Sequence, residues 1–97
     1  MKVAYFPEAL EELEEAVRYY DGKRPGLGDE FFEEVQEAIG RIKELPKGWS
    51  LAGKNTRICQ THRFPYGIVY KIVNNTLVIV AVMHLHRRPG YWKRRLK

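Results

Sequence analysis

The second half of the chain has no acidic residue. Residues 1–46 hold all 12 Asp and Glu but only six of the 17 Lys and Arg, a balance of −6. Residues 47–97 hold the other eleven Lys and Arg and all three His, a balance of +11. Surface charges that serve only solubility are normally mixed in sign, whereas a field of one sign attracts polyanions such as phosphate backbones. We therefore expect the functional surface to lie in residues 47–97.

Cysteine and long apolar runs are also scarce. Cys59 is the only cysteine, so no internal disulfide can form, and a reducing cytoplasm is the expected location. No apolar run approaches the roughly 18 residues of a membrane-spanning helix, and the N-terminus lacks a signal-peptide pattern. We expect no membrane segment. With 97 residues and no repeats, the chain is expected to form one domain over residues 1–97.

The first half has the periodicity of two helices, preceded by a short edge strand at Lys2–Phe6. Apolar residues at spacings of three and four predict a buried stripe on the first helix: Leu10, Leu13, Val17 and Tyr20. Glycine and proline residues in 21–28 break the pattern. The second helix has an apolar face made of Phe31 or Phe32, Val35, Ala38, Ile39 and Ile42. The two helices are predicted to form an antiparallel hairpin.

In the second half the period changes from 3.6 to two. Strands are predicted at Thr56–Arg63, Tyr66–Val73 and Thr76–Leu85, the last two joined by a two-residue turn at Asn74-Asn75. A short basic tail, Tyr91–Lys97, follows. The order β-α-α-β-β-β predicts an α+β domain in which the helical hairpin packs on a mostly antiparallel four-stranded sheet.

The hairpin turn also predicts which side chains share a face. It places Val69 opposite Val80 and Gly67 opposite Val82. The face assigned to the helices carries Tyr66, Ile68, Tyr70, Ile72, Leu77, Ile79, Ala81, Met83 and Leu85. The opposite face carries Gly67, Lys71, His84 and His86 among valines. We expect this second face to be open, or covered by another molecule.

His84 and His86 are candidates for acid–base chemistry. Metal-free RNA cleavage needs a base, an acid and cations around the phosphate, and imidazoles titrate near neutrality. Arg63, Arg87 or Arg88 could neutralise the phosphate, and Tyr91 or Trp92 could stack on a base. The same residues also fit plain surface histidines and an aromatic plug over the core.

A metal-dependent reaction is less well supported. The absence of carboxylates after Glu44 argues against a Mg²⁺-dependent nuclease, which needs oxygen ligands. His84 and His86 could begin a transition-metal site, but Cys59 and His62 are the only candidates for a third ligand. We assign no metal and no other cofactor.

Several motifs resemble the RelE/ParE superfamily of bacterial toxins. They are Phe64-Pro65-Tyr66-Gly67-Ile68-Val69-Tyr70, Val80-Ala81-Val82-Met83-His84 and Arg87-Arg88-Pro89-Gly90-Tyr91-Trp92, with Arg18-Tyr19-Tyr20 and Arg24-Pro25-Gly26-Leu27-Gly28 upstream. The resemblance implies the toxin of a type II toxin–antitoxin pair. Its partner would be an antitoxin that folds over the toxin surface and connects it indirectly to operator DNA.

The superfamily has two kinds of target. RelE-like members cleave mRNA on the ribosome, whereas ParE-like members inhibit DNA gyrase without nuclease chemistry. Gly67 stands where RelE-like toxins carry an Arg, which favours the gyrase inhibitor. The His pair and the basic sheet favour a metal-independent endoribonuclease. An inactive relative retained as a repressor with its antitoxin is a third reading.

The candidate site residues follow from both lines of reasoning. If the protein is a ribonuclease, catalysis is assigned to His84, His86, Arg87 and Tyr91. Binding of nucleic acid or antitoxin is assigned to eight further residues: Lys54, Arg57, Arg63, Lys71, Arg88, Trp92, Lys93 and Arg94.

Overall fold

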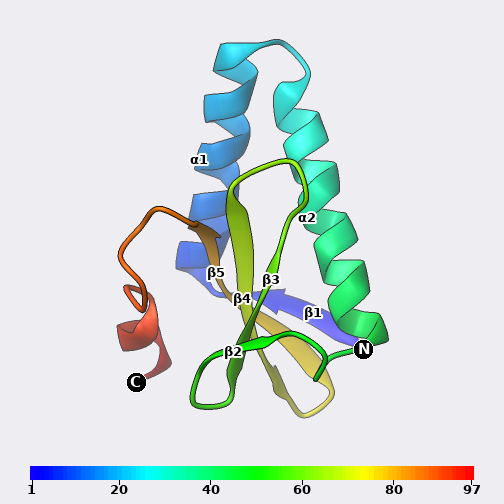
Figure 1. Cartoon of the computed structure of the whole chain (residues 1–97), viewed down its shortest axis with the longest axis vertical. Helices are drawn as coiled ribbons and strands as arrows, with labels where there is room; N and C mark the ends of the chain where they lie inside the picture. The colour runs from blue at the N-terminus through cyan, green and yellow to red at the C-terminus, as the bar shows by residue number, and fades with distance from the viewer.

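The computed structural model describes residues 1–97. The elements are β1 (Lys2–Tyr5), α1 (Pro7–Lys23), α2 (Leu27–Glu44), β2 (Ser50–Gly53), β3 (Thr56–Gln60), β4 (Tyr66–Val73), β5 (Thr76–His84) and a 3-10 helix, η1 (Lys93–Leu96). The two helices form an antiparallel hairpin that extends beyond the end of the sheet (Figure 1). The α+β class and the hairpin are confirmed. Neither helix is both long and apolar enough to cross a membrane.

The sheet has five strands rather than the predicted four, in the order β1-β5-β4-β3-β2. β1 is an edge strand and pairs in parallel with β5, while all other pairs are antiparallel. The strand missing from the prediction is β2, which has only four residues and a register shift before Gly53. Its Leu51 side chain is 69% exposed, so β2 lacks the alternating pattern that identifies a half-buried strand.

The connection between the helices depends on a close approach at Gly28. A Cβ atom built on Gly28 would lie 2.5 Å from the carbonyl oxygen of Val17. The Gly28 N–H donates to Asp21 Oδ1 at 2.7 Å, so a carboxylate at the end of α1 caps the N-terminus of α2. Gly26 precedes α2 with a φ of 88°, a conformation that favours glycine.

The main core lies between the helical hairpin and one face of the sheet. On α1 the buried residues are Ala9, Leu13 and Ala16, whereas Leu10 is 42% exposed, so its assignment to the buried stripe was wrong. The two alanines allow α1 to approach the sheet closely. On α2 Phe31 is fully buried and Phe32 is exposed, which decides between the two predicted candidates.

A bulge in β5 changes the predicted assignment of faces. The turn at Asn74-Asn75 is confirmed, with both residues at positive φ, and pairing is as predicted as far as Tyr70 opposite Ile79. The register then shifts, so that Val69 lies opposite Ala81 rather than Val80. A bulge inserts one unpaired residue and moves later side chains to the other face.

The register shift changes the face on which the side chains after Val80 lie. Ala81 and Met83 leave the helix face and join a second cluster on the opposite face, while Val82 joins the main core. His84 pairs with Tyr66 and therefore no longer shares a face with Gly67, which pairs with Met83.

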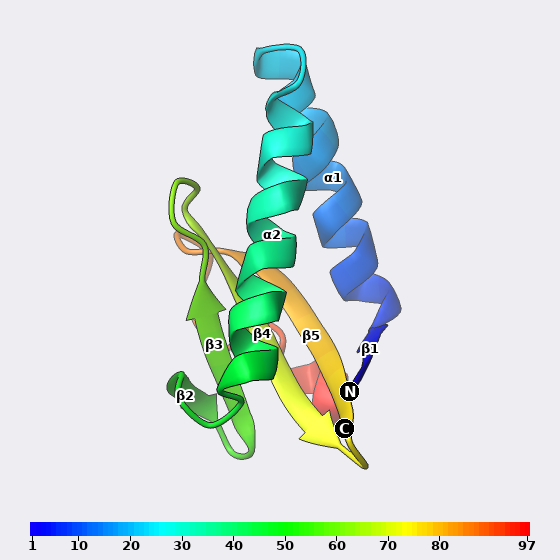
Figure 2. The same ribbon diagram turned by 90° about the vertical axis from the view of Figure 1, so that its right-hand side faces the viewer.

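The second face of the sheet is covered by the chain's own C-terminal segment. Trp92, only 2% exposed, packs with Val69, Val80, Ala81 and Met83. In Figure 2, α2 lies in front of β3 to β5 and the red C-terminal segment is seen behind the strands. The expectation of an open face is therefore wrong, because the apolar tail residues bury it. Trp92 acts as the plug that the sequence left as an alternative to base stacking.

We predict that Gly28→Ala lowers the free energy of unfolding by about 1–3 kcal/mol, because the added methyl group meets the backbone of α1. Gly40→Ala is the matched control. Gly40 lies inside α2 with open space at its Cβ position, so alanine should raise stability by about 0.5–1 kcal/mol. Urea denaturation followed by circular dichroism measures both, and equal effects would contradict the close helix approach.

Candidate functional site

Glu12 of α1 accepts hydrogen bonds from residues of the C-terminal segment. Its carboxylate accepts two hydrogen bonds from the Arg95 guanidinium, Nη1 to Oε1 at 2.9 Å and Nη2 to Oε2 at 2.9 Å. The Tyr91 hydroxyl donates to Oε2 at 2.6 Å, and the Val82 N–H donates to Oε1 at 3.0 Å. The side chains of Glu12 and Arg95 are only 14% and 13% exposed. Paired, hydrogen-bonded and largely desolvated, they hold the C-terminal segment against α1 and β5.

Glu12 and Arg95 also hydrogen-bond to main-chain groups of β5 at an edge that no strand covers. β1 has four residues against nine in β5, and the last main-chain bond between them runs from Phe6 N–H to the Ile79 carbonyl. Beyond Ile79 the Val80 carbonyl accepts from Arg95 Nη1 at 3.0 Å, and the Val82 N–H donates to Glu12. An unpaired buried main-chain group is costly, so these two side chains replace the missing strand.

Arg87 and Tyr91 form one unit with Glu12. The Arg87 guanidinium lies 3.8 Å from the centroid of the Tyr91 ring and 3.5 Å from Glu12 Oε2. Burial, together with donation to the adjacent carboxylate, holds the pKa of the Tyr91 hydroxyl well above its usual range. Tyr91 is therefore a poor proton donor, and Arg87 shares with Arg95 a single carboxylate.

His84 lies on the helix side of the sheet, beside a hollow of about 240 Å³ under α1. Its ring is 5.1 Å from that of Tyr66. The hollow is also lined by Glu12 and Glu15, and its only cation is Arg87. His84 thus faces carboxylates of the acidic half of the chain, not the basic surface on which it was expected.

His86 lies next to His84 but after the strand has ended. The two rings are 5.0 Å apart, and the His86 main-chain N–H donates to His84 Nδ1 at 3.1 Å. Nδ1 is therefore an acceptor, and only Nε2 of neutral His84 can hold a proton. The structure does bring the two histidines together, through a turn rather than along a strand.

Gly67, at the position of the RelE-like arginine, is buried among apolar side chains. A Cβ atom there would lie 2.5 Å from Ile58 Cδ1 and 3.4 Å from Leu85 Cδ2. A larger side chain here would have to shift the end of the Ile58 side chain. The position supplies no cation and has no open space at its Cβ position.

The predicted binding residues fall into three separate groups. Lys54, Arg57 and Lys71 surround the outer end of the sheet, where Arg57 donates to the Trp49 carbonyl at 2.7 Å. Arg63 lies elsewhere, paired with Glu30 of α2 at 2.8 Å. The pKa of the Glu30 carboxyl is lowered, chiefly by that hydrogen bond from Arg63.

The third group is in the C-terminal segment. Arg88, Lys93 and Arg94 are exposed there, and Trp92 is buried beneath them. Arg88 and Arg94 line a hollow of about 470 Å³, together with Arg87, Arg95, Tyr91 and Glu8. These exposed cations remain available to a partner.

Sequence reasoning missed the two residues that hold this region together, Glu12 and Arg95. The signal for Glu12 was its spacing: it follows the buried Ala9 by three residues and precedes the buried Ala16 by four. A glutamate on the buried stripe of a helix requires a partner. Arg95 had no comparable signal, because the tail is uniformly basic.

No three His, Cys, Asp or Glu side chains come together in a way that could hold a metal ion. Cys59, one of the two candidate third ligands, is 1% exposed within the main core. Its burial raises the pKa of the thiol, which disfavours the thiolate that metals bind.

A family model described as "ParE toxin of type II toxin-antitoxin system, parDE" matches residues 3–89. This chain belongs to the ParE toxin family. The resemblance to the RelE/ParE superfamily is thereby confirmed on its ParE side. The family match ends before Tyr91, Trp92 and Arg95, so the contacts that these residues make to Glu12 and the sheet lie outside it.

A solved structure entitled "Chromosomal ParDE TA system from P. aeruginosa" has the same fold as this ParE-family toxin. The TM-score is 0.76 at 12% sequence identity, over 89% of this chain and 97% of the other. At that identity the likeness supports the fold alone. No curated protein matches this ParE-family chain in sequence.

We predict that Glu12→Ala destabilises this ParE-family chain by on the order of 3 kcal/mol, because it leaves Arg95 and the Val82 N–H unpaired. Release of the tail should also expose Trp92 and shift its emission to the red, measured in a Trp49→Phe background. Glu11→Ala, on the exposed side of α1, should change stability by less than about 0.5 kcal/mol. A native-like Trp92 emission in Glu12→Ala would contradict the role of Glu12.

Stability should fall as the solution becomes alkaline. Burial, the largest cause, raises the pKa of Tyr66 to about 12, while the unfolded chain keeps a value near 10.0. Because the folded pKa is the higher one, the contribution is complete below pH 10 and is lost as pH rises toward 12. Urea titrations in this range should show a smaller loss for Tyr66→Phe than for the wild type. Identical pH profiles would contradict the raised pKa.

Proposed function

We propose that this protein arrests bacterial growth by inhibiting DNA gyrase and is neutralised by a cognate antitoxin. Membership of the ParE family supports the toxin class. Its proposed target belongs to the cytoplasm, where we place the protein. The proposal is a non-enzymatic one: the toxin binds its target and performs no bond cleavage.

The observation that carries the proposal is the environment of His84. The hollow beside this imidazole has one lining cation, Arg87, and Arg87 shares the Glu12 carboxylate with Arg95, while Glu15 adds a negative charge. Ribonuclease chemistry needs the reverse, cations gathered around the phosphate.

The remaining groups of a ribonuclease site are also occupied or missing. Tyr91 already donates its proton to Glu12, and Arg87 pairs with the same carboxylate. Gly67 supplies no cation, and the Ile58 side chain lies against its Cβ position. Two of the candidate catalytic residues are therefore bound by Glu12, and the position of the RelE-like arginine has none.

The surface available for gyrase lies on the helical hairpin and the C-terminal segment. The hairpin projects beyond the sheet (Figure 1), and it exposes Tyr19 by 57% and Phe32 by 43%. Exposed aromatic side chains of this size are common anchors at protein interfaces. The exposed arginines Arg88 and Arg94 add positive charge at the other end of α1.

Induced expression without antitoxin, followed by pulse labelling, tests the proposal. We expect thymidine incorporation to collapse before methionine incorporation, and purified protein to reduce supercoiling by gyrase. Early loss of methionine incorporation with continued DNA synthesis would instead indicate mRNA cleavage.

A second candidate function, the endoribonuclease, has one observation in its favour, the contact between the His84 and His86 rings. If it holds, His84→Ala and His86→Ala should each abolish growth arrest and RNA cleavage. If the protein inhibits gyrase as proposed, both variants should still arrest growth. Tyr19→Ala should then weaken inhibition, as a surface anchor of the hairpin.

A further inference from the structure

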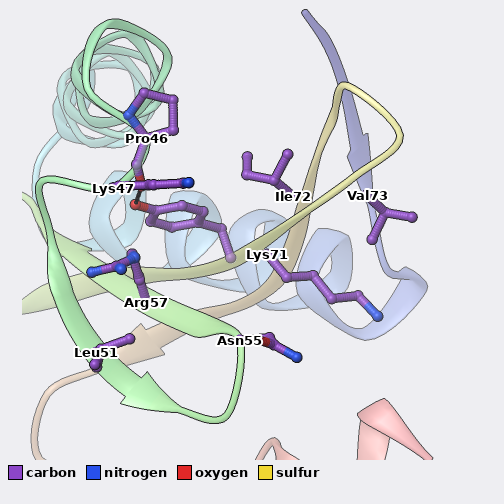
Figure 3. A pocket seen from close by; sticks show the side chains of 9 residues that line it. Pro46, Lys47, Leu51, Asn55, Arg57, Lys71, Ile72 and Val73 are labelled. Atoms are coloured by element: carbon purple, nitrogen blue, oxygen red, sulfur yellow. Dashed lines mark hydrogen bonds between the residues drawn. The ribbon is translucent and has the colours of Figure 1, made fainter.

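The outer end of the sheet contains a hollow of about 450 Å³ that neither the core nor the candidate site uses. Figure 3 shows Leu51 and Arg57 on one side, Pro46 and Lys47 above, and the side chain of Ile72 across from them. The Tyr70 ring lines the floor, and its hydroxyl donates to the Pro46 carbonyl. That bond joins β4 to the segment after α2, so the hollow is preformed.

The rim of this hollow carries charge of one sign. The side chains of Lys47 and Arg57 line it, and none of its nine lining residues is acidic. The ammonium of Lys71 lies away from the hollow, over the Phe6 ring (Figure 3). All nine lining residues come from residues 46–73, in the part of the chain that lacks Asp and Glu. An opposing negative charge would therefore be attracted to Lys47 and Arg57.

The hollow is also where apolar side chains are exposed. Of the eight large apolar side chains that the chain exposes, three line it: Leu51 at 69%, Ile72 at 40% and Val73 at 43%. A fourth, Leu45 at 59%, directly precedes Pro46. Exposed apolar groups gathered in one place mark an interaction surface more than scattered ones do.

We propose that this hollow binds an acidic, amphipathic segment of the antitoxin, with Leu, Ile or Val side chains in the hollow and Asp or Glu against Lys47 and Arg57. This inference rests on the proposed function for the identity of the partner. The pattern of the site, apolar floor and cationic rim, is complementary to a segment that carries both kinds of residue.

A nucleic acid fits the hollow less well. Phosphates would satisfy Lys47 and Arg57 but would leave Leu51 and Ile72 against a hydrated backbone. Stacking of bases needs an exposed aromatic face, and Tyr70, the only aromatic residue here, is 1% exposed. A peptide uses both the charges and the apolar side chains.

Peptides displayed on phage, selected against the intact protein, provide the probe. The selected peptides should be rich in Asp and Glu with interspersed Leu, Ile or Val, and salt should weaken their binding. Binding is then measured by fluorescence anisotropy. Lys47→Glu should weaken it by about fivefold, and Leu51→Ser by about fivefold.

Arg57 is left unchanged because its guanidinium holds the Trp49 carbonyl, and its loss could disturb β2. Two matched controls carry the same kinds of change elsewhere. Lys97→Glu reverses an exposed charge at the C-terminal end of the chain, and Leu10→Ser removes an exposed leucine of α1. Both controls should bind the peptides like the wild type.

The proposal is overturned if the hollow variants bind as tightly as the wild type, or if the C-terminal variant alone loses binding. A selection that yields no peptide dependent on Lys47 and Leu51 also overturns it. Competition by a DNA duplex that depends on the same residues would assign the hollow to nucleic acid instead. The assay contains no gyrase, so its outcome is independent of whether the protein inhibits gyrase.

Discussion

A single carboxylate, Glu12, connects the two halves of this molecule. It belongs to the acidic half of the chain and binds the basic end through Arg95, Tyr91 and the Val82 N–H. Without it, the C-terminal segment would lose its attachment to α1, and Trp92 its support over the second face of the sheet. The segregation of charge along the sequence therefore has an internal role as well as an external one, because one half supplies the anion that organises the other.

Periodicity predicted much of this fold correctly. The helical hairpin and the turn at Asn74-Asn75 follow from local patterns, because a helix face and a positive-φ turn each favour particular residue types at particular spacings. The bulge at Val80 leaves none, since every residue from Leu77 to Met83 is apolar and suits either face. Sequence reasoning therefore placed His84 on the wrong face, and with it the candidate site. The contacts of Trp92 and Arg95 are tertiary, and no local pattern contains them.

Glu12 binds two of the groups that a nuclease reaction would use. Phosphate chemistry needs cations around the phosphate and an acid that releases its proton, yet here Tyr91 donates to Glu12 and Arg87 shares that carboxylate with Arg95. The exposed surfaces are the projecting hairpin, the arginines of the C-terminal segment and the hollow beside Leu51. The proposed inhibitor would act through such surfaces alone.

The order in which the chain is synthesised gives the Glu12 contacts a further meaning. Glu12 and Arg95 are 83 residues apart, and Tyr91 is 79 residues from the same carboxylate. A nascent chain has made both helices long before it has made the residues that complete the sheet and its cover. Contacts so distant in sequence form late. The cover over the second face of the sheet therefore forms only once synthesis is complete.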